Sequence, residues 1–476
     1  MKQGRTPGAD EAPLALAAEY GRTFRQKVRP LHPSASADEL RQAFVIPLPE
    51  EKRLGTDVIE QLIEAAEPGL VGNTDPNFFA WVMGSSDPVG VAADWLTSIW
   101  GQNAAIFQTS PAAAIAEEAV AGWLLDLLDL PRESSVGLVT GATMAAFVGL
   151  AAARSEVLAR AGYDFEETGL QGAPLVRIYA SDDAHSTNFA ALRHLGFGDA
   201  NFNCVPSDHQ GLMRIDALEK MLAATDGPKI VIAQAGHINS GAFENFDAIT
   251  QLARQNNAWV HVDGAFGLWA RVMPEKLFLT RGIELADSWS VDGHKWLQIP
   301  YDSGFAIVRN ADAHKRAMDI SAGYLNQSPD DGRNPTEFNP ELSRRARGFA
   351  AWAVLQHLGR SGVREIISQH CEAAAHLAAE IQNLPGLELQ NSVDLNQVVL
   401  GAGAADQTAA SNLRMHELAE ALNRDHNVFV REATWKDRTV LRLSVISQGS
   451  DSEHIRMLAN AIRTSWQQIA FPEANL

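Results

Sequence analysis

The sequence predicts an α/β protein built on a mostly parallel sheet. Strands and helices alternate from about residue 136 to about residue 310, an order that favours parallel strands joined by right-handed crossovers. The runs 229–235 and 258–262 are mainly apolar, as expected of strands covered on both faces. Polar residues follow these runs, and such sheets bind ligands at the carboxyl ends of their strands. We therefore expect a ligand site at that edge.

The composition fits a large globular chain and excludes several classes. Of the 476 residues, 46% are hydrophobic and 20% are charged, which suits a sizeable core. The formal net charge of −19 disfavours a nucleic-acid partner, which needs clustered Lys and Arg. Two cysteines, Cys204 and Cys371, exclude a disulfide framework and a cysteine-rich zinc site, and we assign no metal.

No targeting or membrane segment is expected. The N-terminus lacks the apolar core of a signal peptide, and no run approaches the roughly 20 apolar residues of a membrane span. We expect a soluble, cytoplasmic protein that does not bind membranes.

The first third of the chain predicts helices and then a phosphate-binding turn. Amphipathic helices are expected at 15–27 and 56–66, and a longer one at 112–128. A strand from Val136 then meets small residues around Ala142 and Thr143, ahead of a helix at 145–160. Small residues let the backbone approach a phosphate at a helix N-terminus, although such junctions are common.

The following strands each end in polar residues. Strand 175–180 precedes His185 and a helix at 188–195. A lone histidine there is more often structural than functional. The strands expected next along the chain are 201–206, 229–235 and 258–262.

The last third predicts a loop, two helices and a small α+β unit. Segment 321–338 is a loop by composition, and helices are expected at 348–358, ending at Gly359, and at 363–383. A strand at 304–309 precedes the loop. After the two helices we expect strands at 387–390, 397–400 and 440–445, and helices at 415–423 and 451–468. We predict three domains: an N-terminal helical segment (1–110), a large α/β domain (111–360) and a small α+β domain (361–476).

Two residues carry the chemistry. Strand 258–262 ends at Asp263, and Lys295 follows 32 positions later in DGHKW. Pyridoxal phosphate needs a lysine amine for its Schiff base and a carboxylate against its ring nitrogen, and the lysine must be partly desolvated. Taken singly, Asp263 is better interpreted as a helix cap and Lys295 as a surface lysine. Together, they favour the cofactor.

The segments HVDGAFG and ADSWSVDGHKW resemble the group II pyridoxal-phosphate decarboxylases, the family of aromatic-amino-acid, glutamate and cysteine-sulfinate decarboxylases. The resemblance extends from about Asp75 to about Ser447. It implies the fold-type-I architecture of pyridoxal-phosphate transferases, with a seven-stranded, mostly parallel sheet flanked by helices. It also implies a homodimer with shared active sites. In such a dimer the N-terminal segment of each subunit packs onto the partner subunit.

The resemblance assigns residues to roles. Lys295 binds the cofactor and moves protons, Asp263 and Ala265 lie at its ring, and His185 stacks on the ring face. The phosphate ligands are Ala142, Thr143, Ser290 and His294. The resemblance places Phe79 and Trp81 in the wall of the substrate pocket, although both are equally well interpreted as ordinary core aromatics. Phe107 would reach this pocket from the neighbouring subunit.

Three positions leave questions open. Asp75 stands where the family usually has histidine, and His237 where it usually has threonine. His237 either faces the cofactor or caps its strand. Arg442 is either a carboxylate partner or, as favoured from the sequence, a surface arginine.

The implied reaction is decarboxylation of an L-amino acid, aromatic by preference, to an amine. The family's mobile loop often carries a tyrosine that protonates the product carbanion, but the loop here has none after Tyr324. Oxidative conversion to an aldehyde and transamination therefore remain alternatives. A non-catalytic protein is disfavoured by the intact Asp263–Lys295 pair.

Overall fold

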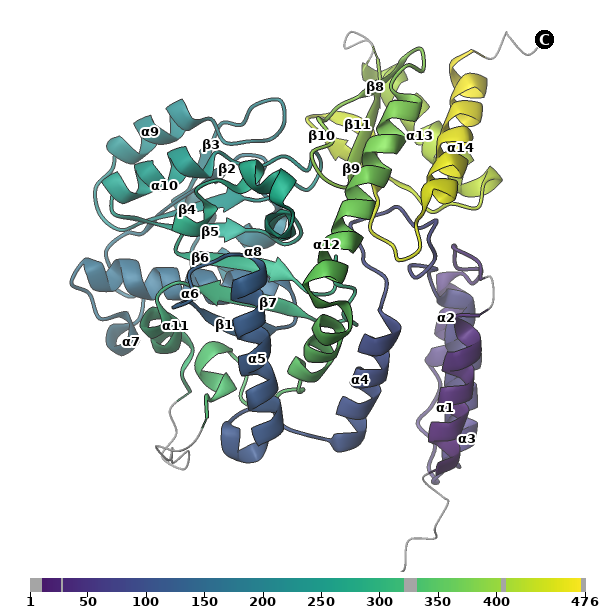
Figure 1. The fold of residues 1–476 in the computed structure, drawn as a ribbon, viewed down its shortest axis with the longest axis horizontal. Helices are drawn as coiled ribbons and strands as arrows, with labels where there is room; N and C mark the ends of the chain where they lie inside the picture. The colour runs from purple at the N-terminus through teal and green to yellow at the C-terminus, as the bar shows by residue number, and fades with distance from the viewer. Residues whose placement is uncertain (1–10, 27–28, 321–331, 404–407, 472–476) are drawn as a thin grey trace, which may run out of the picture.

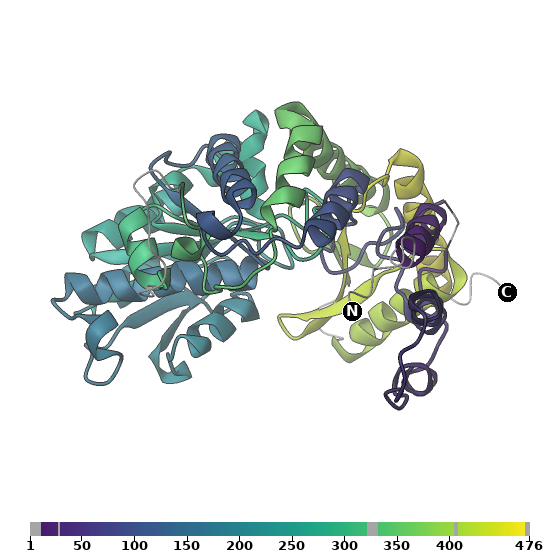
Figure 2. The same cartoon turned by 90° about the horizontal axis from the view of Figure 1, so that it is seen from below.

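The structure is a computed structural model that describes residues 11–26, 29–320, 332–403 and 408–471. Figure 1 shows a large unit around a central sheet, a smaller unit with its own sheet, and a group of N-terminal helices beside the smaller unit. Figure 2 shows the same neighbours from below, with the N-terminal helices again on the side of the smaller unit.

Seven strands form the central sheet in the order β1-β7-β6-β5-β4-β2-β3. Only β7 runs antiparallel to its neighbours, β1 and β6, so the mostly parallel sheet is confirmed. The strands are β1 (Ser135–Val139), β2 (Arg177–Ser181), β3 (Phe202–Val205), β4 (Lys229–Gln234), β5 (Ala258–Asp263), β6 (Ser288–Asp292) and β7 (Gly304–Val308). Their register places Gln234 beside Asp263, and Asp263 beside Ser290, at the carboxyl edge.

Helices cover both faces of this sheet. On one face, α6 (Ala142–Arg160), α8 (Ser186–His194) and α11 (Ala311–Met318) enclose a core with the sheet. On the other, α5 (Pro111–Leu127), α9 (Ile215–Ala223), α10 (Phe246–Gln255) and the first part of α12 (Gly348–Ile381) enclose a second core. A short helix, α7 (Phe165–Thr168), follows α6.

Helix α6 is the one helix among the described residues that is long and apolar enough to cross a membrane, by length and composition alone. It packs on β5, β6 and β7 and against α8 and α11. Burial against the sheet therefore accounts for its composition.

The smaller unit is a four-stranded antiparallel sheet, in the order β10-β11-β9-β8, with helices against it. Its elements are β8 (Leu387–Leu389), β9 (Gln397–Ala402), α13 (Thr408–Asp425), β10 (Arg431–Trp435), β11 (Arg438–Ser444) and α14 (Ser452–Ala470). Strand β10 was not predicted, because its exposed, polar edge position leaves no apolar alternation. The two helices expected at 348–358 and 363–383 form one element, α12, kinked at Gly359.

The N-terminal helices are α1 (Glu11–Phe24), α2 (Ala37–Phe44), α3 (Gly55–Ala66) and α4 (Pro88–Trp100). Sequence analysis identified α1 and α3 but missed α2 and α4. No residue of α1, α2 or α3 is buried, whereas α4 packs along α12. These three helices pack on one another, but their apolar faces are only partly covered within one chain.

Candidate active site

A cavity of about 330 Å³ opens at the carboxyl ends of β4, β5 and β6. Residues from the start of α6 and the start of α8 complete its wall. Seven of the residues predicted from the sequence line it: Ala142, Thr143, His185, Asp263, Ala265, His294 and Lys295. Positions up to 153 residues apart are thus brought together, as the sheet topology requires.

Asp292, the last residue of β6, organises one end of the cavity. Its Oδ2 lies 3.0 Å from Lys295 Nζ, and its Oδ1 lies 3.3 Å from His294 Nε2. The same Oδ1 accepts the backbone N–H of Ala142 at 2.6 Å. One buried carboxylate therefore holds the lysine, the histidine and the beginning of α6. Sequence analysis quoted this aspartate in DGHKW without giving it a role.

Asp263 ends β5 and is held in the cavity by two donors. Its Oδ2 accepts from Asn188 Nδ2 at 2.8 Å, and its Oδ1 accepts from the backbone of Ala265 at 3.2 Å. Asn188 lies in the first turn of α8, three residues after His185, and was missed from the sequence. The carboxylate is buried and fixed in one orientation, ready to meet a basic ring nitrogen.

His185 is the N-cap of α8. Its backbone N–H donates to Gln234 Oε1 at 3.0 Å, and its Nδ1 lies 2.6 Å from Thr187 Oγ1. The histidine itself caps the helix, because its side chain accepts the backbone N–H of Thr187. Burial lowers the pKa of His185, and nearby cations add to this effect while Asp263 opposes it. The ring is therefore neutral near pH 7.

The N-terminus of α6 lines the cavity beside Asp292. Gly141, Ala142 and Thr143 lead into α6, whose first N–H groups have no partner within the helix. A Cβ at Gly141 would lie 3.0 Å from the His294 ring, so the turn needs glycine there. Burial lowers the pKa of His294, whose ring stacks on Tyr301 with centroids 4.3 Å apart.

Ser290 does not join these residues. It is fully buried in β6, outside the lining of the cavity, and its Oγ has no hydrogen-bond partner among the described residues. Its predicted contact with phosphate stays a prediction.

The aromatic residues predicted for the substrate pocket do not line this cavity either. Phe79 is fully buried in the core of the smaller unit, so the core interpretation is correct. Trp81 packs on Phe78 and Phe429 at the surface. The backbone N–H of Phe107 donates to Asn334 at 2.9 Å; Phe107 does not reach the cavity of its own chain, and its contribution to a partner's pocket stays a prediction.

The structure places two of the three open positions, His237 and Arg442. His237 is fully buried and does not line the cavity. Arg442 is partly buried and donates to Ile238 O at 3.3 Å and Asn239 Oδ1 at 3.2 Å, so the surface interpretation is wrong. Burial lowers the pKa of Arg442.

These residues fit pyridoxal phosphate. A lysine amine, a fixed carboxylate and a helix N-terminus match its aldehyde, its ring nitrogen and its phosphate. Gln234 lines the same cavity, and its buried Nε2 has no partner among the described residues, so it offers a further donor. When bound, the cofactor supplies a ring that accepts electrons from the carbon next to the substrate's amine.

The fold and this site define a pyridoxal-phosphate enzyme of fold type I. Residues 39–402 match the model of the pyridoxal-dependent decarboxylase conserved domain, and the chain belongs to that family. Its cofactor is pyridoxal 5'-phosphate.

Curated relatives match along most of their length. The chain is 29% identical to tryptophan decarboxylase 1 of Oryza sativa subsp. japonica over 423 residues, covering 84% of this chain and 82% of that protein. It is 26% identical to the aromatic-L-amino-acid decarboxylase of Mus musculus, covering 93% and 92%. It is 24% identical to phenylacetaldehyde synthase of Arabidopsis thaliana, covering 86% of both.

Solved structures confirm the fold. The structure of Oryza sativa TDC with PLP and tryptamine superimposes with a TM-score of 0.90 at 23% identity, covering 98% of this chain and all of that one. At this identity the likeness shows the architecture.

Proposed function

We propose that the protein decarboxylates an L-amino acid, preferably an aromatic one, to the corresponding amine and carbon dioxide. The observation that carries this proposal is the cavity in which Lys295 and Asp263 lie together with the N-terminus of α6. Met144, Ile238 and Phe266 give the same cavity apolar wall area, which supports an apolar or aromatic side chain. The names of the curated relatives support the same substrate class.

The proton that replaces the carboxylate must come from a group inside the cavity. Glu337 is buried and lies 2.9 Å from Lys315, and His237 does not line the cavity. Lys295 is the one lysine that lines it among the described residues. We infer that Lys295 delivers this proton once the substrate has displaced it. Ser328, Asp330 and Asp331 lie outside the described residues.

A second candidate is aldehyde formation. No tyrosine occurs between Leu325 and Pro340, and one curated relative is a phenylacetaldehyde synthase. In that reaction the amino acid, oxygen and water give the aldehyde, carbon dioxide, ammonia and hydrogen peroxide. Transamination, in which no carbon dioxide is released, is the third outcome.

One experiment separates these outcomes. The protein is incubated with each of the twenty amino acids, and carbon dioxide, amine, aldehyde and peroxide are measured together. Amine equal to carbon dioxide, without peroxide, is expected. Peroxide equal to carbon dioxide moves the assignment to aldehyde synthesis, and a new keto acid without carbon dioxide rejects both. The Lys295→Ala variant is the matched blank.

We also propose a cytoplasmic homodimer. Helices α1 to α3 bury no residue in one chain, and an apolar groove of about 410 Å³ runs between α4, α5 and α12. Large exposed apolar areas mark interfaces, and a two-fold dimer would cover both features. Two unpaired cysteines suit a reducing compartment.

Sedimentation tests the dimer. Ile115 lines the groove and is 49% exposed, while Leu175 is 50% exposed outside it. Ile115→Glu is expected to give a monomer without activity, and Leu175→Glu an active dimer. A wild-type monomer that is active at assay concentration would contradict the proposal.

A further inference from the structure

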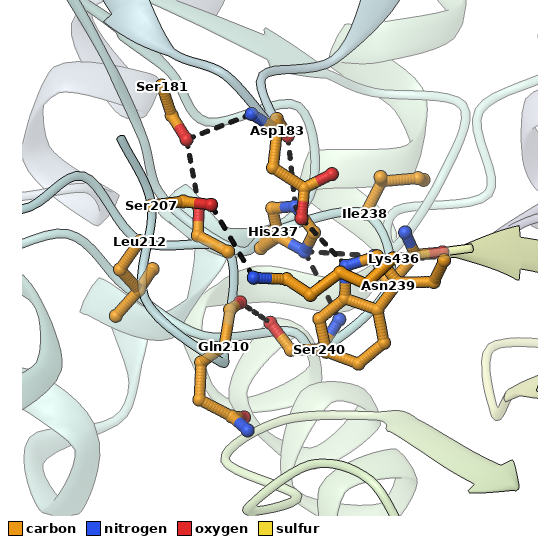
Figure 3. Close-up of polar contacts among 12 residues, drawn as sticks. Ser181, Asp183, Ser207, Gln210, Leu212, His237, Ile238, Asn239, Ser240 and Lys436 are labelled. Atoms are coloured by element: carbon orange, nitrogen blue, oxygen red, sulfur yellow. Dashed lines mark hydrogen bonds and ion pairs between the residues drawn. The ribbon is translucent and has the colours of Figure 1, made fainter. Parts of the chain in front are cut away.

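The loop from Gly236 to Gly241 follows β4 and presents alternate residues to the cavity. Gly236 and Ile238 line the cavity, whereas His237 between them is fully buried behind it. The His237 ring lies 5.8 Å from the Trp435 ring of β10, centroid to centroid. Figure 3 shows Asp183 pointing toward the His237 ring. This histidine therefore lies where the cavity wall meets the smaller unit.

Both ring nitrogens of His237 form hydrogen bonds. Nδ1 accepts the backbone N–H groups of Asn239 and Ser240, each at 3.3 Å. Because Nδ1 accepts, the ring proton lies on Nε2, which donates to Asp183 O at 3.0 Å and lies 3.3 Å from Asp183 Oδ2. The ring thus shapes its own loop and ties it to the β2–α8 loop.

Asp183 joins three parts of the molecule. It lies two residues before His185, and its Oδ2 accepts from Trp435 Nε1 at 2.7 Å. Burial alone would raise the pKa of Asp183, but hydrogen bonds from His237 and Trp435 hold it below its ordinary value. The carboxylate is therefore ionised near pH 7 and its bonds to both donors are charge-assisted, which makes them stronger than neutral ones.

The smaller unit holds the same loop from its other side. Arg442 of β11 donates to Ile238 O and Asn239 Oδ1. Asn391 donates to Ser240 O at 2.8 Å. Next to this loop, Lys436 donates to Asp208 O and reaches toward Ser207, both in the connection between β3 and α9 (Figure 3). Two cavity residues, Gly236 and Ile238, thus lie on a loop that forms hydrogen bonds with both units.

We propose that His237 is a positioning residue which, through Asp183 and Trp435, locks the 236–241 loop and His185 in the arrangement that receives the cofactor. It touches neither cofactor nor substrate and acts through Gly236, Ile238 and His185. The inference rests on the cavity of the proposed function but not on which amino acid reacts or which product forms.

The test measures cofactor binding, which is separate from turnover. The full-length apoprotein of each variant is titrated with pyridoxal 5'-phosphate, and the absorbance spectrum of the bound cofactor is recorded. His237→Phe keeps a ring and removes both nitrogens, so we expect about tenfold weaker binding and a shifted spectrum. His237→Gln restores a donor near the Nε2 position and should recover binding to within about threefold. His209→Gln, on an exposed histidine of a nearby turn, is the matched control and should match wild type.

A second variant keeps the test decisive if His237→Phe does not fold. Trp435→Phe keeps an aromatic ring but removes the indole N–H that donates to Asp183, together with part of the ring, and should weaken cofactor binding in the same direction by about threefold. Equal damage in the Phe and Gln variants of His237 would overturn the proposal, as would wild-type affinity and spectrum in Trp435→Phe. If His237→Phe loses decarboxylation but binds the cofactor as wild type does, the result would count against this role for His237. It would also count against the catalytic groups of the proposed function.

Discussion

One oxygen of the Asp292 carboxylate lies 3.0 Å from the Lys295 amine, while the other accepts the backbone N–H of Ala142 at 2.6 Å. The lysine that binds the cofactor and the turn that faces its phosphate are therefore held by a single side chain. Since both contacts are close and the carboxylate is buried, Asp292 fixes the distance between the Lys295 amine and the turn at Ala142.

Asp292→Asn should weaken cofactor binding. The amide keeps the shape but loses the charge, and its NH2 group must face a donor, either Ala142 N, His294 or Lys295. Losing charge-assisted bonds of about 1.5–3 kcal/mol predicts roughly tenfold or greater loss of affinity. Titration of the apoprotein with pyridoxal 5'-phosphate measures it, with Asp216→Asn, an exposed aspartate paired with Arg214, as control. Unchanged affinity would show that Asp292 does not organise the site.

Lys295→Ala should abolish covalent attachment of the cofactor and leave the fold intact. Reduction of the wild-type protein with borohydride, followed by peptide mass mapping, should place the pyridoxyl group on Lys295. Lys220→Ala, on the exposed side of α9, should keep the label. A label on any other lysine would refute the central assignment.

Asp263→Asn should retain the cofactor and lower turnover by two or more orders of magnitude, since each ~1.4 kcal/mol lost costs tenfold. A neutral amide cannot stabilise a protonated ring nitrogen as a carboxylate does. Asn188→Ala removes only the 2.8 Å bond that orients Asp263 and should cost about tenfold. Turnover in Asp263→Asn within a few-fold of wild type would contradict this role.

What the sequence predicted well follows from local signals. Strand β5 was placed at 258–262 against an observed Ala258–Asp263, because strands buried on both faces are continuous apolar runs. Asp263, Lys295 and His185 were identified because each follows such a strand in a recognisable motif, and all three line the cavity.

What was missed depends on distant partners. Asn188 and Asp263 are 75 positions apart, and Gln234 meets the backbone of His185 across 49, so no local pattern marks either pair. Phe79 illustrates the opposite failure. An aromatic residue beside a motif gives the same pattern whether it lies in a core or in a pocket, and here it lies in the core.

Glu244 provides a prediction about pH. Burial raises the pKa of this carboxyl from 4.5 to about 8, and its oxygens accept the backbone N–H of Met213 at 3.0 and 3.2 Å. Between pH 4.5 and about 8 the folded state keeps a proton that the unfolded state has lost. Stability from this group is therefore full below pH 4.5 and is lost as the pH rises through 8, by at most about 1.4 kcal/mol per pH unit.

Glu244→Gln should remove this dependence. Urea unfolding at pH 6 and pH 9 should show that the variant gains stability relative to wild type as the pH rises. Glu219→Gln, on an exposed glutamate of α9, should follow wild type. Parallel stability curves for Glu244→Gln and wild type would mean that Glu244 is ionised when folded.

The position of β7 has a consequence for the order in which the protein is made. Ser135 of β1 bonds to Val308 of β7 across 173 positions, and β7 lies between β1 and β6. Gly304 comes so near Gly141 that an added Cβ would lie 2.4 Å from the Gly141 Cα. The phosphate turn and Lys295 thus meet across a strand that leaves the ribosome after both. Pairing over such a distance is slow, and β1 cannot join the rest of the sheet until residues 304–308 have been made.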